Sequence, residues 1–278
     1  MRHILAIALS TLIFTGCSKA PEPEVDVAPQ PTAAQAQDIR GEEVTYTVGD
    51  TTLTGYIAYD ANQQGQRPGV LIVHEWWGHN DYVRTRAHML AKLGYTAFAL
   101  DMYGDGKLAT HPEDAQKFMM EVMNNIPTAE ARFAAAHKLL DEHNTTNPAQ
   151  TAAMGYCFGG AMVLHQARIG SDLAGVASFH GNLSTTSPAK AHGVNAKVLV
   201  LHGADDPFVP QEQVDAFKKE MAAAVADYKF IAYPGAVHAF TNPGATEIGE
   251  EFGLPLAYNP NADEQSWNEL KDFLNQLF

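Results

Sequence analysis

The stretch Met154-Gly155-Tyr156-Cys157-Phe158-Gly159-Gly160 decides the fold of this chain. It has the G-x-S-x-G spacing of a nucleophile elbow, with a cysteine in place of the serine. At such an elbow a strand turns sharply into a helix, and the flanking positions need the smallest residues. The spacing therefore predicts that the thiol of Cys157 projects from the end of a sheet as a nucleophile. The amide of Phe158 is then the expected first donor to an oxyanion.

Two apolar runs downstream lead into residues that could complete a catalytic triad. The first is followed by His202-Gly203-Ala204-Asp205-Asp206-Pro207, and the second by Gly235-Ala236-Val237-His238-Ala239-Phe240. The resulting chain order of nucleophile, acid and histidine is the order of α/β-hydrolases. We expect His238 to be the base for Cys157 and Asp206 to hold its other ring nitrogen. Asp205 is the alternative acid, less favoured because Asp206 directly precedes Pro207.

Strand and helix patterns alternate along the rest of the chain. Segments 44–48 and 53–59 alternate apolar and polar residues around Gly49-Asp50, which predicts an antiparallel hairpin, and 69–74 is a continuously apolar strand. Further strands are expected at about 95–100, 151–154, 174–179, 198–201 and 228–233, with helices at about 81–93, 112–125, 128–143, 158–169, 210–225 and 263–277. The pattern predicts the α/β-hydrolase fold: a mostly parallel, doubly wound sheet with helices on both faces and an N-terminal antiparallel hairpin.

Residues 1–16 are predicted to be a lipoprotein signal peptide. Arg2 and His3 precede an apolar run, 4–14, that is too short to span a bilayer, and Thr15-Gly16-Cys17 follows. We expect cleavage before Cys17 and lipidation of that residue; an ordinary signal peptide with an incidental cysteine is the alternative. Residues 17–40 are predicted to be a disordered tether rich in Pro, Ala and Gln, because large apolar side chains are almost absent. Residues 41–278 would then form the α/β-hydrolase domain.

The composition excludes some partners. The chain has 18 Lys and Arg against 32 Asp and Glu, for a net charge of −14. This acidity argues against nucleic acid as a partner, and it leaves the N-terminal lipid anchor as the expected membrane contact. The predicted location is the periplasmic or outer-membrane face of a bacterial membrane, after export. The sequence does not set the oligomeric state.

The loop His74-Glu75-Trp76-Trp77-Gly78-His79 follows the apolar strand and contains further candidates. We assign the second oxyanion donor to the amide of Trp76. The side chains of the two tryptophans, Trp76 and Trp77, are expected to line an apolar pocket, and Tyr103 could donate a hydrogen bond to the substrate. No metal site or cofactor is expected, because the two histidines are five residues apart and leave a strand instead of lying on a helix. The histidines beside strand ends, His74, His79, His180 and His202, are expected to be structural.

Four segments in order resemble the dienelactone hydrolase family. They are the glycine-flanked Cys157, the strand-end Glu75 with its aromatic pair and Gly78, the string Asp206-Pro207-Phe208-Val209-Pro210, and 235–240. The resemblance runs from about residue 45 to the C-terminus. It implies a cysteine hydrolase whose resting thiol is neutral, with Glu75 helping to deprotonate Cys157 when substrate arrives. A carboxylate can take a thiol proton once it is desolvated or displaced from a better partner.

This sequence lacks two arginines that hold the substrate carboxylate in well-studied members of that family. Asp101-Met102-Tyr103 is followed by Gly104 and Asp105, and Asn242 occupies the position four residues after His238. Without these cations a carboxylate substrate has no charge-assisted clamp. We therefore expect a neutral ester or lactone as the substrate, instead of dienelactone itself.

The leading hypothesis is hydrolysis of small carboxylic esters or lactones through a Cys-His-Asp triad and a thioester on Cys157. The alternative from another class is a catalytically idle surface lipoprotein that uses the same pocket to bind a small molecule or a partner. A thiol redox role ranks last because the sequence has no C-x-x-C pair. A buried structural thiol is the alternative for Cys157, and the flanking glycines favour the catalytic role over it. The methionine-rich segment 118–123 is expected to pack in the core, with a lid over the site as the alternative.

Overall fold

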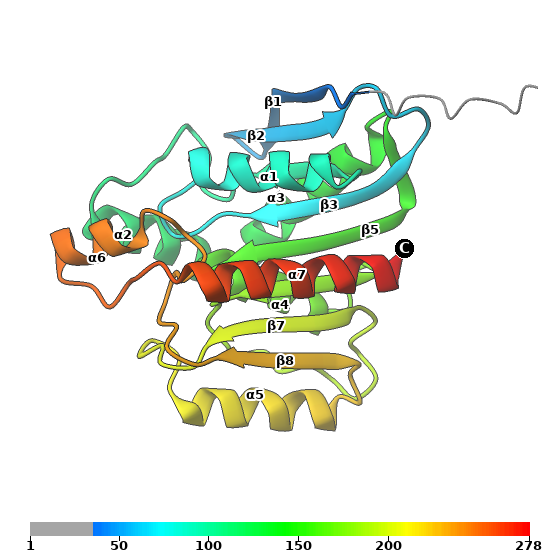
Figure 1. The fold of residues 1–278 in the computed structure, drawn as a ribbon. Helices are drawn as coiled ribbons and strands as arrows, with labels where there is room; N and C mark the ends of the chain where they lie inside the picture. Colours follow the sequence, from blue (N-terminus) through cyan, green and yellow to red (C-terminus); the bar gives the residue numbers. More distant parts are fainter. Residues whose placement is uncertain (1–35) are drawn as a thin grey trace, which may run out of the picture. The chain divides into compact units, whose positions relative to one another are not determined.

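The computed structural model describes residues 36–278, which contain one eight-stranded sheet (Figure 1). The strand order is β1-β2-β4-β3-β5-β6-β7-β8. The strands are β1 (Ile39–Val48), β2 (Thr51–Asp60), β3 (Arg67–Val73), β4 (Thr96–Leu100), β5 (Thr146–Tyr156), β6 (Gly175–Phe179), β7 (Lys197–Gly203) and β8 (Tyr228–Tyr233). Strands β3 to β8 are parallel to one another, whereas β2 pairs antiparallel with β4. The predicted fold class is confirmed.

The strands β1 and β2 form the expected antiparallel hairpin, which turns at Gly49. Because β1 begins at Ile39, the last two residues of the predicted tether, Ile39 and Arg40, belong to the first strand of the domain. The predicted boundary at residue 41 was therefore two residues late. The signal peptide and Cys17 fall within residues 1–35, which lie outside the described residues.

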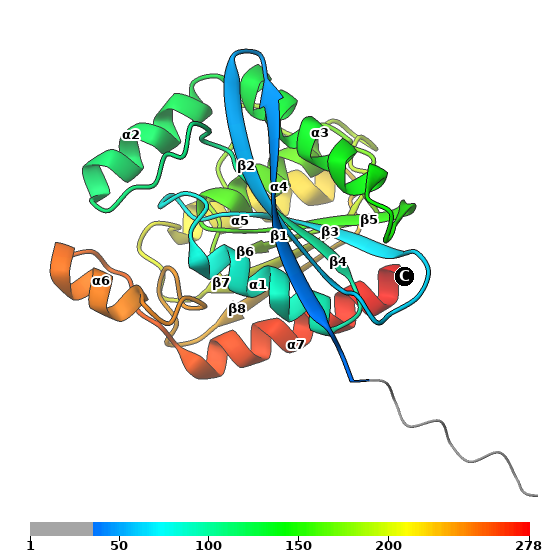
Figure 2. The same cartoon turned by 90° about the horizontal axis from the view of Figure 1, so that it is seen from above.

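Seven helices connect these strands within residues 36–278: α1 (Asp81–Lys92), α2 (Pro112–Met123), α3 (Ile126–Glu142), α4 (Phe158–Arg168), α5 (Gln211–Ala223), α6 (Ala245–Phe252) and α7 (Pro260–Leu277). One buried cluster joins the apolar sides of α1 and α7 to one face of the sheet. A second cluster joins α3, α4 and α5 to the other face. Figure 2 shows this arrangement from above, with α1 and α7 on the side of the sheet opposite α3. Burial of both faces explains the continuously apolar parallel strands.

Two features of the helices differ from the sequence prediction. The helix α6 was not predicted, because it has only eight residues and contains a glycine at its centre. The first helix, predicted at about 81–93, ends at Lys92, and Leu93 is its C-terminal cap and is 42 % exposed. None of the helices in the described part of the chain is long and apolar enough to cross a membrane.

The carboxyl ends of the parallel strands place the candidate site. Glu75 follows β3, Cys157 follows β5, Asp206 follows β7 and His238 follows β8. Parallel strands present their carboxyl ends at a single edge of the sheet, so residues from four distant parts of the sequence meet there. The sheet and its two apolar layers hold these loops in place.

Candidate active site

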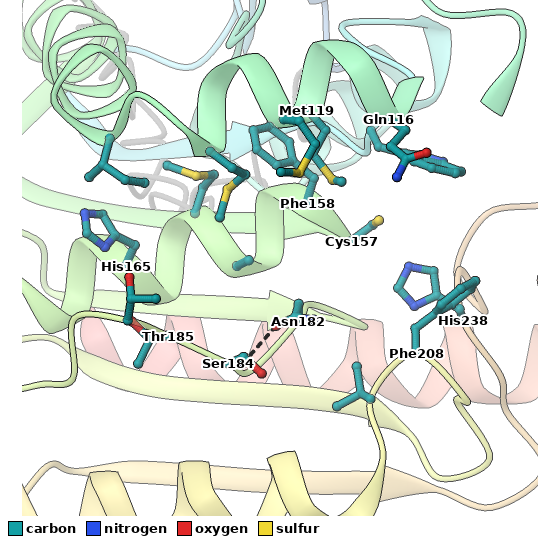
Figure 3. A pocket seen from close by; sticks show the side chains of 18 of the residues that line it. Gln116, Met119, Cys157, Phe158, His165, Asn182, Ser184, Thr185, Phe208 and His238 are labelled. Atoms are coloured by element: carbon teal, nitrogen blue, oxygen red, sulfur yellow. Dashed lines mark hydrogen bonds between the residues drawn. The ribbon is translucent and has the colours of Figure 1, made fainter. Parts of the chain in front are cut away.

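Cys157 stands on a strained turn between β5 and α4. Its backbone has φ 53° and ψ −114°, a conformation that residues other than glycine rarely adopt. A Cβ atom on Gly155 would lie 2.1 Å from the backbone oxygen of Gly159, and one on Gly159 would lie 2.3 Å from that of Val73. Neither glycine can be replaced without moving backbone, which is the physical reason for the glycine spacing. The partly exposed Cys157 side chain points toward His238 across one end of a cavity (Figure 3).

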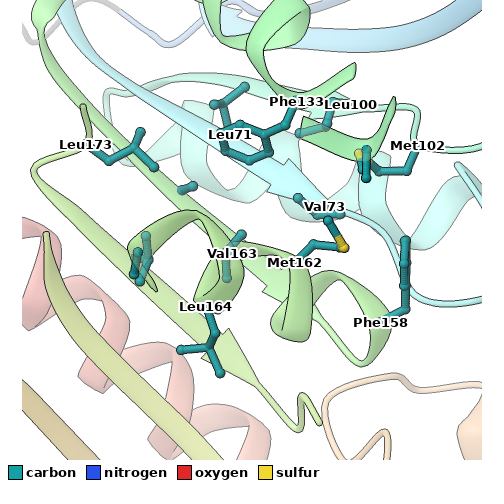
Figure 4. Packing of buried hydrophobic residues seen from close by; sticks show 14 of the residues in the cluster. Leu71, Val73, Leu100, Met102, Phe133, Phe158, Met162, Val163, Leu164 and Leu173 are labelled. Carbon is teal, nitrogen blue, oxygen red and sulfur yellow. The ribbon is translucent and has the colours of Figure 1, made fainter. Parts of the chain in front are cut away.

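The helix behind the nucleophile is fixed by the core. Phe158, Met162 and Val163 of α4 belong to the same buried cluster as Leu71 and Val73 of β3 (Figure 4). The amide of Gly159 also donates to the backbone oxygen of His74, 3.1 Å away. The start of α4 is therefore held against the end of β3, which fixes the position of the Cys157 sulfur.

His180 supports the elbow from the neighbouring strand. The amide of Cys157 donates to the backbone oxygen of Phe179 at 3.0 Å and to Nδ1 of His180 at 3.1 Å. Because Nδ1 of His180 accepts, its Nε2 carries the proton and donates to Oγ1 of Thr241, 2.9 Å away. Thr241 Oγ1 also lies 2.7 Å from the hydroxyl of Tyr82. His180 was expected to be structural, and in the structure it supports the backbone of Cys157 through this hydrogen bond.

His238 and Asp206 form the expected acid–histidine pair. Nδ1 of His238 donates to Oδ2 of Asp206 at 2.7 Å, and both side chains are buried. Burial lowers the pKa of His238, but the charge of Cys157 and the hydrogen bond with Asp206 outweigh it and raise the pKa to about 10. Asp205 instead accepts from the amide of Gly235 at 3.1 Å and stays exposed. The choice of Asp206 over Asp205 agrees with this geometry.

Glu75 is a buried carboxyl group with one polar side-chain partner. It is 3 % exposed, and its Oε2 accepts a hydrogen bond from Nδ2 of Asn242 at 2.6 Å. Burial raises the pKa of Glu75 to about 7, although the hydrogen bond with Asn242 acts in the opposite direction. In the sequence, Asn242 was notable only because it occupies the position of an arginine in well-studied members of the dienelactone hydrolase family. The structure shows that its amide holds the glutamate.

The two backbone amides predicted to be oxyanion donors have no hydrogen-bond acceptor in the described part of the protein. Within residues 36–278, neither the amide of Trp76 nor that of Phe158 donates to a backbone or side-chain acceptor. The hydroxyl of Tyr103 donates to the backbone oxygen of Trp76 at 2.9 Å and so fixes the orientation of the loop after β3. Free donors next to a nucleophile are the arrangement that an oxyanion hole requires.

A cavity of about 750 Å³ opens beside Cys157. It is lined mainly by apolar side chains, among them Trp76, Met119, Met162, Phe208 and Leu256. The size and the apolar character are those of a small-molecule site. Met119, Met120 and Met123 of α2 face this cavity. Phe118, Met119 and Val122 of the same helix also pack in or against the buried cluster, so the segment contributes to both the core and the cavity wall.

Two predicted pocket residues lie elsewhere. Trp77 packs into a separate buried cluster with Ala109, Ala115 and Ala239 and does not line the cavity. Tyr103 is 2 % exposed and uses its hydroxyl on the backbone, as described above. The Trp77 assignment is corrected because the loop after β3 turns Trp76 toward the cavity and Trp77 away from it. The Tyr103 assignment is corrected because its hydroxyl already donates to the backbone oxygen of Trp76.

His74 and His79 bond to protein groups, whereas Nδ1 of His202 is buried without a hydrogen-bond partner among residues 36–278. His74 Nδ1 donates to the backbone oxygen of Glu75 at 2.6 Å, and its Nε2 accepts from the amide of Met102 at 3.1 Å. His79 Nε2 donates to the backbone oxygen of Ala99 at 3.0 Å, and burial lowers its pKa to about 4. In the described part of the chain, no group of His, Cys, Asp and Glu side chains has the arrangement of a metal site.

Known proteins are similar to this chain in sequence and fold. The chain is similar to Protein usf of Aquifex pyrophilus, with 27% identity over 232 residues that cover 82% of this chain and 95% of that protein. Among solved structures, a dienelactone hydrolase-like promiscuous phosphotriesterase from metagenomic libraries matches with a TM-score of 0.80 and 32% identity, covering 86% of this chain and 99% of that one. The structure named m3DLH matches with a TM-score of 0.80, 34% identity and the same coverage. The sequence profile of the Dienelactone hydrolase family matches residues 53–278. This chain therefore belongs to the dienelactone hydrolase family and is a hydrolase.

Proposed function

We propose that the protein hydrolyses small, neutral carboxylic esters or lactones through a thioester on Cys157. The observation that carries this proposal is the arrangement at the sheet edge: a thiol on a strained elbow, facing an imidazole that is hydrogen-bonded to a buried aspartate at 2.7 Å. Two free backbone amides beside the thiol support it. This is the set of groups that covalent acyl transfer requires.

Glu75 is the base that we assign to Cys157. The pKa of His238 rises to about 10 largely because of a negative charge on Cys157, so the imidazole is protonated once the thiolate has formed and then serves as the acid. The carboxyl of Glu75, with a pKa of about 7, is ionised at and above neutrality and can accept the thiol proton after leaving Asn242. This division of labour makes Glu75 the base and His238 the acid.

The reaction then follows from the positions of these groups. The thiolate of Cys157 attacks the carbonyl carbon, and the oxyanion accepts hydrogen bonds from the amides of Trp76 and Phe158. His238 donates its proton to the leaving alkoxide, which departs as the alcohol and leaves a thioester. The neutral imidazole next removes a proton from water as the water attacks the thioester. Loss of the thiolate releases the carboxylic acid.

The charges around the cavity favour a neutral substrate. Arg168 is the one Lys or Arg among the cavity-lining residues of the described chain. Its guanidinium is already bound to the carboxylate of Glu220 through two hydrogen bonds, at 2.9 and 3.0 Å. No second Lys or Arg lines the cavity walls of residues 36–278 to replace the missing arginines, and the imidazole of His238 is already paired with Asp206, so a substrate carboxylate would be desolvated without a free cation.

A panel of neutral esters, lactones and carboxylate-bearing lactones tests the proposal. Wild-type protein should hydrolyse the neutral compounds best, and Cys157→Ala should lose at least about a thousandfold of that activity. Unchanged activity in Cys157→Ala would refute the cysteine mechanism. Absence of all turnover in the wild type, with slow alkylation of Cys157 that does not vary between about pH 5 and 9, would favour the idle binding protein instead.

We also propose that the enzyme is exported and anchored through lipid on Cys17. The support is the sequence alone, since Cys17 lies in residues 1–35, outside the described residues. Cells fed labelled palmitate should incorporate label into the wild type and not into Cys17→Ala, and the variant should leave the membrane fraction. Label on the variant, or a wild type that never fractionates with membranes, would contradict the anchor.

A further inference from the structure

The cavity continues beyond the reacting thiol along the whole length of α4. We propose that this extension binds an unbranched acyl chain, so that the preferred substrates are esters of medium-chain fatty acids with about eight to ten carbons. This inference rests on the proposed function and specifies its substrate. We call the extension the acyl trough and define it by Ala161, Met162, His165 and Arg168 of α4 with the α2 residues Met119, Met120 and Met123.

One face of α4 forms the floor of the trough. The lining residues Phe158, Ala161, Met162, His165 and Arg168 recur every three or four positions, which is the spacing of one helix face. From Cys157 to Arg168 the helix rises about 16 Å, at 1.5 Å per residue. An extended hydrocarbon with bonds of about 1.5 Å and angles near 111° advances about 1.25 Å per carbon. The length of the trough therefore corresponds to at most about thirteen carbons, and an acyl chain of about eight to ten carbons fits within it.

The methionines of α2 form the apolar wall. Met119, Met120 and Met123 lie on one side of that helix and face the cavity, and Met120 and Met123 remain 41 % and 37 % exposed. Unbranched, flexible thioether side chains adapt to the shape of an apolar ligand. Figure 3 shows Met119 above α4, with Ser184 and Thr185 of the loop after β6 on the opposite side. An alkyl chain in the trough would cover exposed methionine surface without displacing any charge.

The far end of the trough offers no free charge. Arg168 is paired with Glu220, and Nε2 of His165 lies 2.8 Å from Oε1 of Glu130. A chain that ends in a methyl group therefore suits this end better than one ending in a carboxylate.

The position of His238 decides which part of the ester enters the trough. The leaving alkoxide has to lie beside His238, which donates the proton to it. Figure 3 places His238 and Phe208 at the Cys157 end of the cavity, with His165 at the opposite end. Because the acyl group lies on the other side of the carbonyl carbon from the alkoxide, the acyl chain is the part that extends along α4.

The test is kcat/KM for 4-nitrophenyl esters with acyl chains of 2 to 16 carbons. Each buried methylene is worth about fourfold in binding, so partial burial of six of them gives at least a tenfold gain. We expect kcat/KM to rise at least tenfold from acetyl to octanoyl, mainly through KM, and to fall beyond about twelve carbons. If kcat/KM stays constant or falls as the acyl chain lengthens, and Cys157→Ala abolishes the hydrolysis, the acyl trough is refuted and the proposed function is not.

Two variants assign the profile to the trough. Ala161→Phe fills its floor one turn from the nucleophile, and Met123→Glu places a carboxylate in its wall; each should reduce the octanoyl-to-acetyl ratio to below threefold. Lys117→Glu, on an exposed position of α2 that does not line the cavity, is the matched control and should keep the wild-type ratio. If Ala161→Phe does not fold, Met123→Glu carries the comparison. An octanoyl-to-acetyl ratio equal to that of the wild type in the folded trough variants would overturn the inference. Ester hydrolysis that persists in Cys157→Ala would overturn both the inference and the proposed function.

Discussion

Replacement of Glu75 by Gln should stabilise the protein at alkaline pH while slowing catalysis. The carboxyl of Glu75 is buried, and burial raises its pKa from the ordinary 4.5 to about 7. The folded state thus binds a proton that the unfolded chain releases between these two values, so ionisation of Glu75 destabilises the fold as pH rises through this window. A carboxyl pKa moved from 4.5 to about 7 corresponds to about 3 kcal/mol of unfolding free energy above pH 7.

Urea denaturation at pH 5 and pH 8.5 measures this effect. The glutamine has no charge to desolvate, and its side-chain oxygen can still accept from Asn242. Relative to wild type, Glu75→Gln should gain less than about 1 kcal/mol at pH 5 and about 3 kcal/mol at pH 8.5, with ester hydrolysis reduced about a hundredfold or more. Glu250→Gln, an exposed carboxyl, should show no comparable gain. A stability difference that does not vary with pH, or a loss at pH 8.5, would refute the buried-carboxylate account.

Three further predictions follow from the site. Asn242→Ala removes the hydrogen bond that lowers the pKa of Glu75, so the pKa of this carboxyl should rise further. The acidic limb of the pH profile of kcat/KM, expected near pH 7, should then move to higher pH. A limb at the same pH in the variant and the wild type would exclude Glu75 as the essential base. Asp206→Asn should lower kcat by about a thousandfold or more because His238 loses its orienting carboxylate, and steady-state kinetics showing less than a tenfold loss would contradict that role. Gly159→Ala should destabilise the fold by about 2 kcal/mol or more, measured by urea denaturation, since its Cβ would lie 2.3 Å from a backbone oxygen of β3.

The elbow and the pairing of Asp206 with His238 could be predicted because they depend on short sequence patterns. A cysteine on a turn with φ 53° needs small residues on both sides, and the glycines that meet this requirement all lie within seven consecutive residues. Asp206 and His238 follow apolar strands, and parallel strands deliver their carboxyl ends to a common edge whatever their separation in sequence. The hairpin of β1 and β2 was likewise visible from its alternation and its Gly49-Asp50 turn.

The parts that sequence could not predict depend on long-range contacts. Asn242 donates to Glu75 across 167 positions, and nothing near either residue indicates the pairing. Trp76 and Trp77 are adjacent and chemically identical, so only the path of the loop decides which one faces the cavity. The methionines of α2 have the spacing of either a core helix or a cavity wall, and the position of α2 relative to α4 distinguishes the two.

Mass spectrometry of the protein, quenched during turnover of a slowly hydrolysed neutral ester, tests the central claim most directly. We predict a mass increase equal to the acyl group on the peptide that contains Cys157, removed by hydroxylamine at neutral pH as expected of a thioester. The adduct should accumulate when deacylation is slow, and it should be absent from Cys157→Ala. Turnover without any acylated Cys157 peptide, or an acyl group on a different residue, would contradict the account.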